Sequence, residues 1–470
     1  MSLQNTRTKI QILATISASI SGIPNGMQTA WTAPIIPKLQ APDSPIPITD
    51  TDIIWIESIM WIGCIAGLPI TILLLNKYGS KISTMIAAVQ CIIAWVLIAC
   101  ASSVEYLYIS RFITGIANNN AFVSTPIYIA EISDKNIRGF LGAFTYTTML
   151  TGIILVYSIA PFVSLVTSSI VGASFLIIQL VTFPFMPDTP YFLLGKGYDE
   201  KAKKSLQRLR GTDEVDEELI EISLAVERQK SCQSRFLDLF RVKSNRKAIT
   251  IMTVLNFTQH FSGMSSVLMN LHSIINGSVS VSANTAAILF SVLMLASAFI
   301  SSVIIDKVGR KAILGWSCIL TGTCLFVIAV YFTLKSTMDM QSYNWILLTA
   351  ILFYAICFKI GIGLVPIVMT AEIFPMSIKA IGVTMADAVY VVFAYISITM
   401  YQLIVQHYDI YVVFYVFGVC CFCAGLFTFC YIPETTGRSL EEVQMLLKSE
   451  KQKRSYGSNS EIGSLANDAQ

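Results

Sequence analysis

The chain is poor in charged residues and in histidine. Only 13% of its 470 residues are Asp, Glu, Lys or Arg, whereas soluble domains average about 25%. The three histidines are scattered, and the 11 cysteines show no metal-ligand or disulfide spacing, so we expect neither a metal nor a cofactor. No catalytic motif of a soluble enzyme is present. Composition therefore argues against a water-soluble enzyme and against a disulfide-stabilised fold.

What the chain has instead is long apolar stretches, with 54% hydrophobic residues overall. A helix needs roughly 20 apolar residues to cross a bilayer, and twelve stretches qualify. The first is too long for a signal-peptide core, so we expect it to be retained. We predict an all-α membrane protein with 12 transmembrane helices. The stretches are 10–36, 53–75, 82–104, 106–131, 139–163, 167–186, 249–275, 284–305, 312–334, 345–371, 380–406 and 409–431.

A polar segment separates the first six stretches from the last six. From Lys196 to Lys247 it carries 13 Lys or Arg and 10 Asp or Glu, which cannot enter hydrocarbon. We expect it to be a partly helical linker in water. The predicted parts are a six-helix bundle over 1–187, the linker over 188–248, a second six-helix bundle over 249–432, and a cytosolic tail over 433–470 with a disordered end.

The distribution of basic residues predicts the orientation. With both termini in the cytosol, only Lys38 and Lys335 fall in outer loops, while Arg111 and Lys359 lie within stretches. All other Lys and Arg are then cytosolic, as the positive-inside rule requires. The Asn276-Gly-Ser sequence then lies outside and is a glycosylation acceptor.

The two halves repeat each other. The loop at 76–81 follows the second stretch, and a similar loop at 306–311 follows the eighth. Glu131 and Glu372 each lie in an Ala-Glu-Ile sequence that ends the fourth and tenth stretches. A third pair, Pro-Asp-Thr and Pro-Glu-Thr, follows the sixth and twelfth. Three pairs in one order at nearly constant spacing indicate a duplicated unit in parallel orientation, as in transporters that rock two halves around a central site.

These motifs resemble those of the sugar porters of the major facilitator superfamily. The resemblance rests on Asp-Lys-x-Gly-Arg-Lys at 306–311 and Pro-Glu-Thr-x-Gly-Arg at 433–438, and it covers roughly 10–445. Residues 30–34 and 361–366 are most similar to insect facilitated trehalose transporters. The resemblance implies two parallel six-helix repeats, a monomer in the plasma membrane, and uniport of trehalose or a hexose such as glucose by alternating access.

The resemblance also assigns gating to charged residues at the cytosolic ends of the helices. Ion pairs there would hold the inner gate shut, although basic loop residues could instead only set the topology. Asn76 and Ser80 stand where the family has Asp and Arg, so we expect the latch to depend more on 306–311 than on 76–81. The gating candidates are Glu131, Arg138, Asp306, Lys307, Arg310, Glu372, Lys379, Glu434 and Arg438.

The expected substrate site departs further from the family. Only the first Gln of the family's sugar-contacting set in the seventh stretch remains. Ile367 replaces one Trp of the family, and Tyr390-Val391 replaces an Asn-Trp pair. Hydroxyls and rings remain, whereas most amides and both Trp are lost. Each Tyr could also be ordinary helix packing. The substrate-binding candidates are Gln259, His260, Ser265, Tyr146, Lys359 and Tyr390.

Lys359 lies deep in the tenth stretch, where an unpaired charge costs several kcal/mol. From the helical rise of 1.5 Å per residue, Asp387 lies at a similar depth. We hypothesise a Lys359–Asp387 pair. The alternatives are a lysine that extends unpaired into water or one that contacts an anionic substrate.

Three functions stay open on these grounds. Facilitated sugar transport is favoured, followed by transport of another small polar or anionic solute, and then by a non-transporting sensor on the same fold. The stretch 10–36 contains no Asp or Glu, which favours passive over proton-coupled transport.

Overall fold

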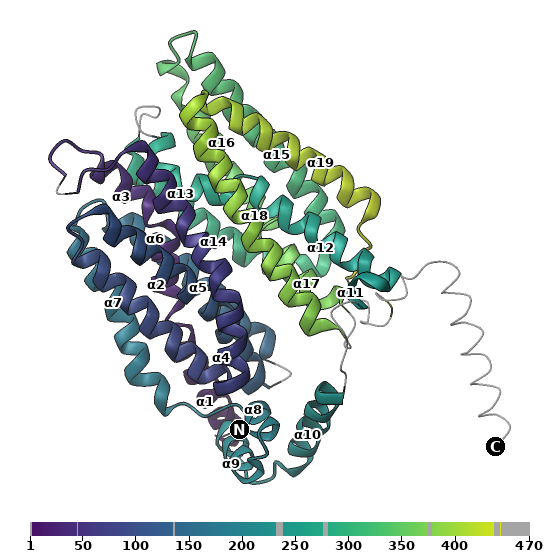
Figure 1. Cartoon of the computed structure of the whole chain (residues 1–470). Coiled ribbons are helices and arrows are strands. Elements are labelled where there is room, and N and C mark those ends of the chain that lie inside the picture. Colours follow the sequence, from purple (N-terminus) through teal and green to yellow (C-terminus); the bar gives the residue numbers. More distant parts are fainter. Residues whose placement is uncertain are drawn as a thin grey trace.

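The computed structural model describes residues 2–44, 46–134, 137–231, 238–275, 281–374, 378–436 and 442. These residues form helices and connecting turns, without strands. The helices gather into two neighbouring bundles, with the first half of the chain in purple and blue and the second half in teal to yellow (Figure 1).

The first bundle contains the helices that precede the linker. They are α1 (Ser2–Ser19), α2 (Gly22–Ala30), α3 (Thr32–Leu39), α4 (Asp50–Ala99), α5 (Val104–Ile132), α6 (Arg138–Ile159) and α7 (Leu165–Thr182), followed by the 3-10 turn η1 (Phe183–Phe185).

The expected linker contains short helices, and the second bundle follows them. The linker helices are α8 (Pro190–Gly195), α9 (Asp199–Arg210), α10 (Asp216–Ser231) and α11 (Asp238–Arg241). The second bundle consists of α12 (Lys243–Phe261), α13 (Met264–Ile275), α14 (Ala283–Val308), α15 (Arg310–Lys335), the turn η2 (Gln341–Tyr343), α16 (Asn344–Ile360), α17 (Val365–Ile373), α18 (Lys379–His407) and α19 (Ile410–Tyr431).

Among the described residues, 8 helical segments are long and apolar enough to cross a membrane. One of them, α4, holds both the second and third expected stretches, which meet at a sharp kink at Gly79, where φ is 81° and the backbone is not helical. The first and seventh stretches are divided into α1–α3 and α12–α13, so no single piece is both long and apolar enough. The fourth, α5, is 29 residues long but carries Arg111 and the Asn118–Asn120 run, which lower its hydropathy.

Two helices of the second bundle are interrupted within the membrane. Between α12 and α13 the chain turns at Gly263, whose φ of 79° favours glycine. A Cβ there would lie 2.5 Å from the Phe417 ring. Between α16 and α17 it turns at 361–364. Such breaks free backbone groups for contacts inside a bundle, as in transporters with discontinuous helices.

We call the end of the bundles that holds segments 40–49 and 336–343 the outer end, and the end with the linker the inner end. Lys38 lies at the outer end and donates hydrogen bonds to the carbonyls of Ala160 and Val163, each at 2.7 Å. These carbonyls lie just beyond α6, where the helix dipole favours a cation. Burial lowers the pKa of Lys38 below its ordinary value.

The polar contacts described between the bundles lie at the outer end and at mid-depth. At the outer end, the Thr32 hydroxyl donates to the Met269 carbonyl at 3.2 Å, and the Tyr157 hydroxyl donates to the Leu268 carbonyl. Figure 1 shows α3 and α13 together at the top, whereas the lower ends of the two bundles spread apart. The bundles are therefore in contact at the outer end, and their helices diverge toward the inner end.

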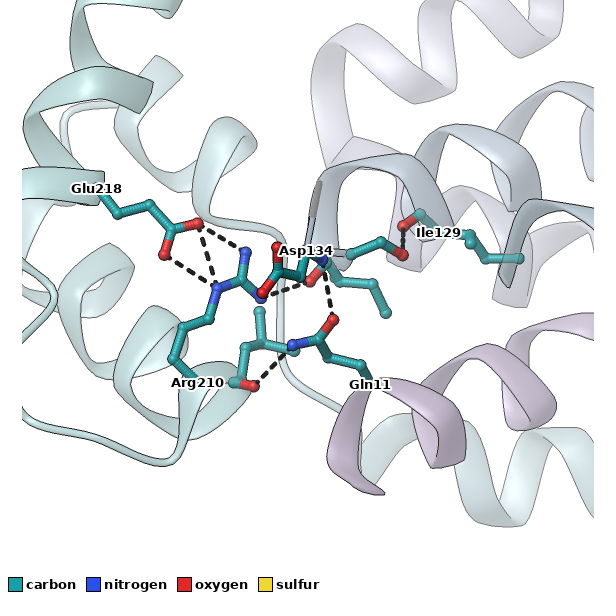
Figure 2. A network of polar contacts seen from close by, with 8 residues as sticks. Gln11, Ile129, Asp134, Arg210 and Glu218 are labelled. Atoms are coloured by element: carbon teal, nitrogen blue, oxygen red, sulfur yellow. Dashed lines mark hydrogen bonds and ion pairs between the residues drawn. The ribbon is translucent and has the colours of Figure 1, made fainter. Parts of the chain in front are cut away.

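The linker helices are attached to the first bundle through Arg210 (Figure 2). Its guanidinium donates to the carboxylate of Glu218 through two nitrogens and to the Ile132 carbonyl at the end of α5 at 3.0 Å. Nearby, the Gln11 side chain accepts from the Asp134 backbone N–H and donates to the Leu209 carbonyl. This network fixes α9 and α10 against α1 and α5.

Candidate functional site

His260 is the centre of a mid-depth cluster in which both bundles take part. It ends α12, is 1% exposed, and its Nδ1 lies 3.2 Å from the Ser265 hydroxyl at the start of α13. Its ring packs edge-on against Tyr390 of α18 at 4.2 Å and Trp61 of α4 at 5.8 Å. Nε2 is buried with no hydrogen-bond partner among the described residues. The structure therefore leaves one imidazole nitrogen of the cluster unsatisfied.

Lys359 contacts Tyr146 across the interface between the bundles. Its ammonium donates a hydrogen bond to the Tyr146 hydroxyl of α6, and lies 4.8 Å from that ring and 5.6 Å from the Phe358 ring. The hypothesised Lys359–Asp387 pair is wrong for this structure, because no ion pair joins these two described side chains. Helical rise gives the depth of a residue, but not the side toward which it points, and Lys359 points to the other bundle.

The remaining expected residues lie around this contact. The Gln259 amide donates to the Gly363 carbonyl at 3.4 Å, in the break between α16 and α17. Gly363 is also adjacent to Lys359, since a Cβ on it would be 3.2 Å from the lysine Cδ. Gln259 directly precedes His260 in α12, which brings this contact next to the His260 cluster. The six residues expected for the substrate site thus form two neighbouring groups at the bundle interface.

The chemistry of these groups suits a polar solute. They offer an ammonium and an amide as donors, phenols and an imidazole that both donate and accept, and aromatic faces. A polyhydroxylated molecule needs this mixture, because each hydroxyl is both donor and acceptor and its C–H faces pack on rings.

A second polar group, not found from the sequence, lies nearer the outer end. Glu57 of α4 is 0% exposed and accepts hydrogen bonds from Asn270 of α13, at 3.1 Å, and from Gln402 of α18. Arg111 of α5 donates to the backbone carbonyl of Ile56, the residue before Glu57, at 3.2 Å and to that of Gln28 at 2.7 Å. A carboxylate within the apolar stretch 53–75 was the sequence signal for this group.

At the inner end of the second bundle, Glu434 caps the start of α15. Its carboxylate accepts hydrogen bonds from the backbone N–H of Arg310 at 3.0 Å and of Lys311 at 3.1 Å. Burial alone would raise the pKa of Glu434, but hydrogen bonds from Thr436 and these N–H groups lower it overall. Gly309 makes room, since a Cβ there would be 2.8 Å from a Glu434 oxygen. The two sequence motifs at 306–311 and 433–438 are therefore in contact.

The corresponding inner end of the first bundle is held by a different set of polar contacts. Lys81 forms an ion pair with Asp188 at 3.4 Å, and the Ser80 hydroxyl donates to Glu131 at 3.1 Å. The described contacts of Glu131 and Glu434 thus stay within one bundle and its adjoining segment. An ion-pair latch between the bundles stays a prediction, since the inner ends are apart here.

The remaining gating and modification candidates are described only in part. Lys307 is exposed at the end of α14. Asn276 and Arg438 lie outside the described residues, as do the side chains of Arg138, Asp306, Glu372 and Lys379.

Comparison with known proteins places the whole chain in one family. The family model for "Sugar (and other) transporter" matches residues 6–447. The facilitated trehalose transporter Tret1 of Apis mellifera ligustica is 30% identical over 443 residues, which cover 93% of this chain and 88% of that protein. Tret1 of Bombyx mori is 29% identical, with 93% and 87% covered. For Tret1 of Drosophila virilis, at 29% identity, the chain spans only 48% of the relative's length.

Solved structures agree on the fold. The inward-open xylose transporter XylE from E. coli superimposes with a TM-score of 0.76 at 22% identity, covering 92% of this chain and 99% of that one. The same transporter bound to 6-bromo-6-deoxy-D-glucose gives 0.75 at 23% identity, covering 94% and 100%. The chain therefore belongs to the sugar transporter family and has the fold of the major facilitator superfamily.

Proposed function

We propose that this protein carries a sugar across a membrane by facilitated alternating access, with trehalose or a hexose such as glucose as its substrate. The observation that supports it most is the mid-depth cluster, to which both bundles contribute at the breaks of α12–α13 and α16–α17. The full-length similarity to facilitated trehalose transporters supports the choice of sugar.

Transport assays test this proposal directly. Purified protein in liposomes should take up labelled trehalose or glucose down a gradient, and a panel of unlabelled sugars should compete. A protonophore should leave the initial rate unchanged if transport is passive. Saturable sugar binding without uptake would instead indicate a sensor, and the absence of both would reject the sugar proposal.

An anionic solute is the second candidate, because Lys359 is buried and has no carboxylate partner among the described residues. A ligand anion could supply that partner. This candidate is favoured if a sugar acid competes more strongly than the matching neutral sugar. The difference between the two competitors should then disappear in Lys359→Gln. Equal competition by both sugars rejects it.

We further propose that the protein is monomeric in the plasma membrane with both termini in the cytosol, and that the charged gating candidates form a latch when the inner ends meet. The distribution of basic residues supports the orientation. Substitution Asn276→Gln should remove a glycan shift in a secretory host. Antibody labelling of a terminal tag on intact cells would contradict this orientation.

A further inference from the structure

Glu57, Asn270 and Gln402 form a closed group of side chains across the bundle interface. Glu57 comes from α4 of the first bundle, whereas both amides come from α13 and α18 of the second. Besides donating to Glu57, the Gln402 side chain donates to the side-chain Oδ1 of Asn270 at 3.3 Å, and the Asn270 side chain donates to the backbone carbonyl of Ser266 at 3.1 Å. Glu57 is thus held in place by two donors that belong to the other bundle.

The surroundings of this group are packed and largely apolar. Asn270 and Gln402 are 7% and 8% exposed, and one oxygen of Glu57 has no hydrogen-bond partner among the described residues. A buried carboxylate is stable only while hydrogen bonds and nearby positive charge replace water. Asn270 and Gln402 supply those bonds, and Arg111 supplies the charge. If the outer ends part, both amides leave Glu57 together.

The group is also connected to the mid-depth cluster. Trp61 lies one helical turn from Glu57 on α4 and packs against His260, while Ser397 on α18 donates to the His260 carbonyl at 2.8 Å. The helices that carry Glu57 and Gln402 therefore also contact the candidate site. Motion of the outer contact must change the surroundings of His260.

We propose that Glu57, with Asn270 and Gln402, is the outer latch of this transporter, and that its hydrogen bonds favour the conformation closed at the outer end. The bonds exist only while α4 lies against α13 and α18, so they stabilise that conformation alone. This inference rests on membership of the transporter family but not on the identity of the solute.

A native cysteine reports on the opening of the outer end. Cys64 is buried at 6% exposure in the same interface, in one apolar cluster with Met60, Met269 and Ile398. On intact cells, a membrane-impermeant maleimide can reach Cys64 only when the outer end is open. The background variant Cys100→Ser removes the exposed thiol at the outer end of α4, and mass spectrometry then measures labelling at Cys64.

Glu57→Ala in this background should raise the labelling rate at Cys64 roughly tenfold, the change expected when about 1.4 kcal/mol of conformational preference is lost. Gln402→Ala should act in the same direction, and the double variant should be no faster than the faster single variant, because both break one contact. Thr333→Val is the matched control. It removes a polar contact between Thr333 and Tyr415 within the second bundle and should leave labelling unchanged.

The proposal is overturned if the labelling rate at Cys64 is unchanged in both Glu57→Ala and Gln402→Ala. It is also overturned if the effects of the two substitutions on that rate add fully in the double variant. If Glu57→Ala does not reach the cell surface, Gln402→Ala and Asn270→Ala decide alone, since each removes one donor and leaves the acid. The readout is labelling rather than uptake. A chain that transports no sugar can therefore still confirm the latch, and a sugar transporter can still fail this test.

Discussion

Lys359 and Tyr146 belong to different bundles, and the ammonium of one donates a hydrogen bond to the phenol of the other. The same ammonium lies 4.8 Å from the centroid of the Tyr146 ring and 5.6 Å from that of Phe358, so rings surround it beside the hydrogen bond. A buried charge is thereby accommodated without a carboxylate. The pair also joins α6 to α16, so a solute that competes for Lys359 changes the contact between the bundles.

Removing either member of this pair should impair transport. Tyr146→Phe keeps the ring and loses the acceptor, whereas Lys359→Ala loses the charge. A hydrogen bond to a charged group is worth about 1.5–3 kcal/mol, so we expect each variant to lower uptake by liposomes about tenfold or more. The double variant should be no worse than Lys359→Ala. As a comparison, the effect of Asp387→Asn should add to that of Lys359→Ala; mutual rescue would restore the hypothesis of a Lys359–Asp387 pair.

Substitution of Arg210 should weaken the attachment of the linker helices to the first bundle. Lysine cannot reproduce its planar fork, so Arg210→Lys should loosen α9 and α10 from the first bundle. Hydrogen exchange should then become faster over residues 199–218. Lys203→Ala is the control, because its ion pair with Asp216 is largely exposed and contributes little. Equal exchange in the two variants would show that the Arg210 network does not hold the linker.

A side chain at Gly263 should destabilise the protein. Alanine at its φ of 79° costs about 1–2 kcal/mol, and its Cβ would also overlap the Phe417 ring. Gly263→Ala should therefore lower the thermal midpoint of the protein in detergent. A Cβ added at Gly142 in α6 would meet nothing within 4 Å, so Gly142→Ala should be neutral or stabilise by about 0.5–1 kcal/mol. The prediction fails if both alanines behave alike.

The stability from Glu434 should depend on pH in the acidic range. Its pKa is lowered in the folded protein relative to the ordinary value of 4.5. Such a group stabilises the fold at pH above 4.5, and this contribution is lost as pH falls through the lowered folded value. Glu434→Gln should therefore lower the thermal midpoint at pH 6 and approach the unmodified protein under strongly acidic conditions. A midpoint difference that grows on acidification contradicts the assignment.

The membrane-spanning architecture could be predicted from the sequence because hydropathy and charge act over whole helices. Stretches as long as 284–305 leave few alternatives, and the repeated motifs gave the pairing of the halves. The weak α5 was still found, although Arg111 and its asparagines lower its hydropathy. The break between α16 and α17 falls where Gly and Pro cluster, at 361–366.

The partners of polar side chains could not be predicted in the same way. The position of Lys359 along its helix follows from the sequence, but its partner depends on helix rotation, which no periodicity in a uniformly apolar segment reveals. His260 and Tyr390 were selected by comparison with a family pattern, and packing then brought them to 4.2 Å. Glu57 was missed because acids were sought in 10–36, whereas the acid that contacts the other bundle is in α4.

Lys38 has a consequence for the electric field that a solute meets on its approach. Its charge is partly offset by the dipoles of two carbonyls. The exposed charged residues there include Asp43, Asp50 and Glu105 as well as Lys335. A surface with an excess of acidic residues repels anions and lowers their local concentration, by an amount that salt reduces. A neutral sugar enters this end without that barrier, whereas an anion would travel more readily outward from the basic inner end.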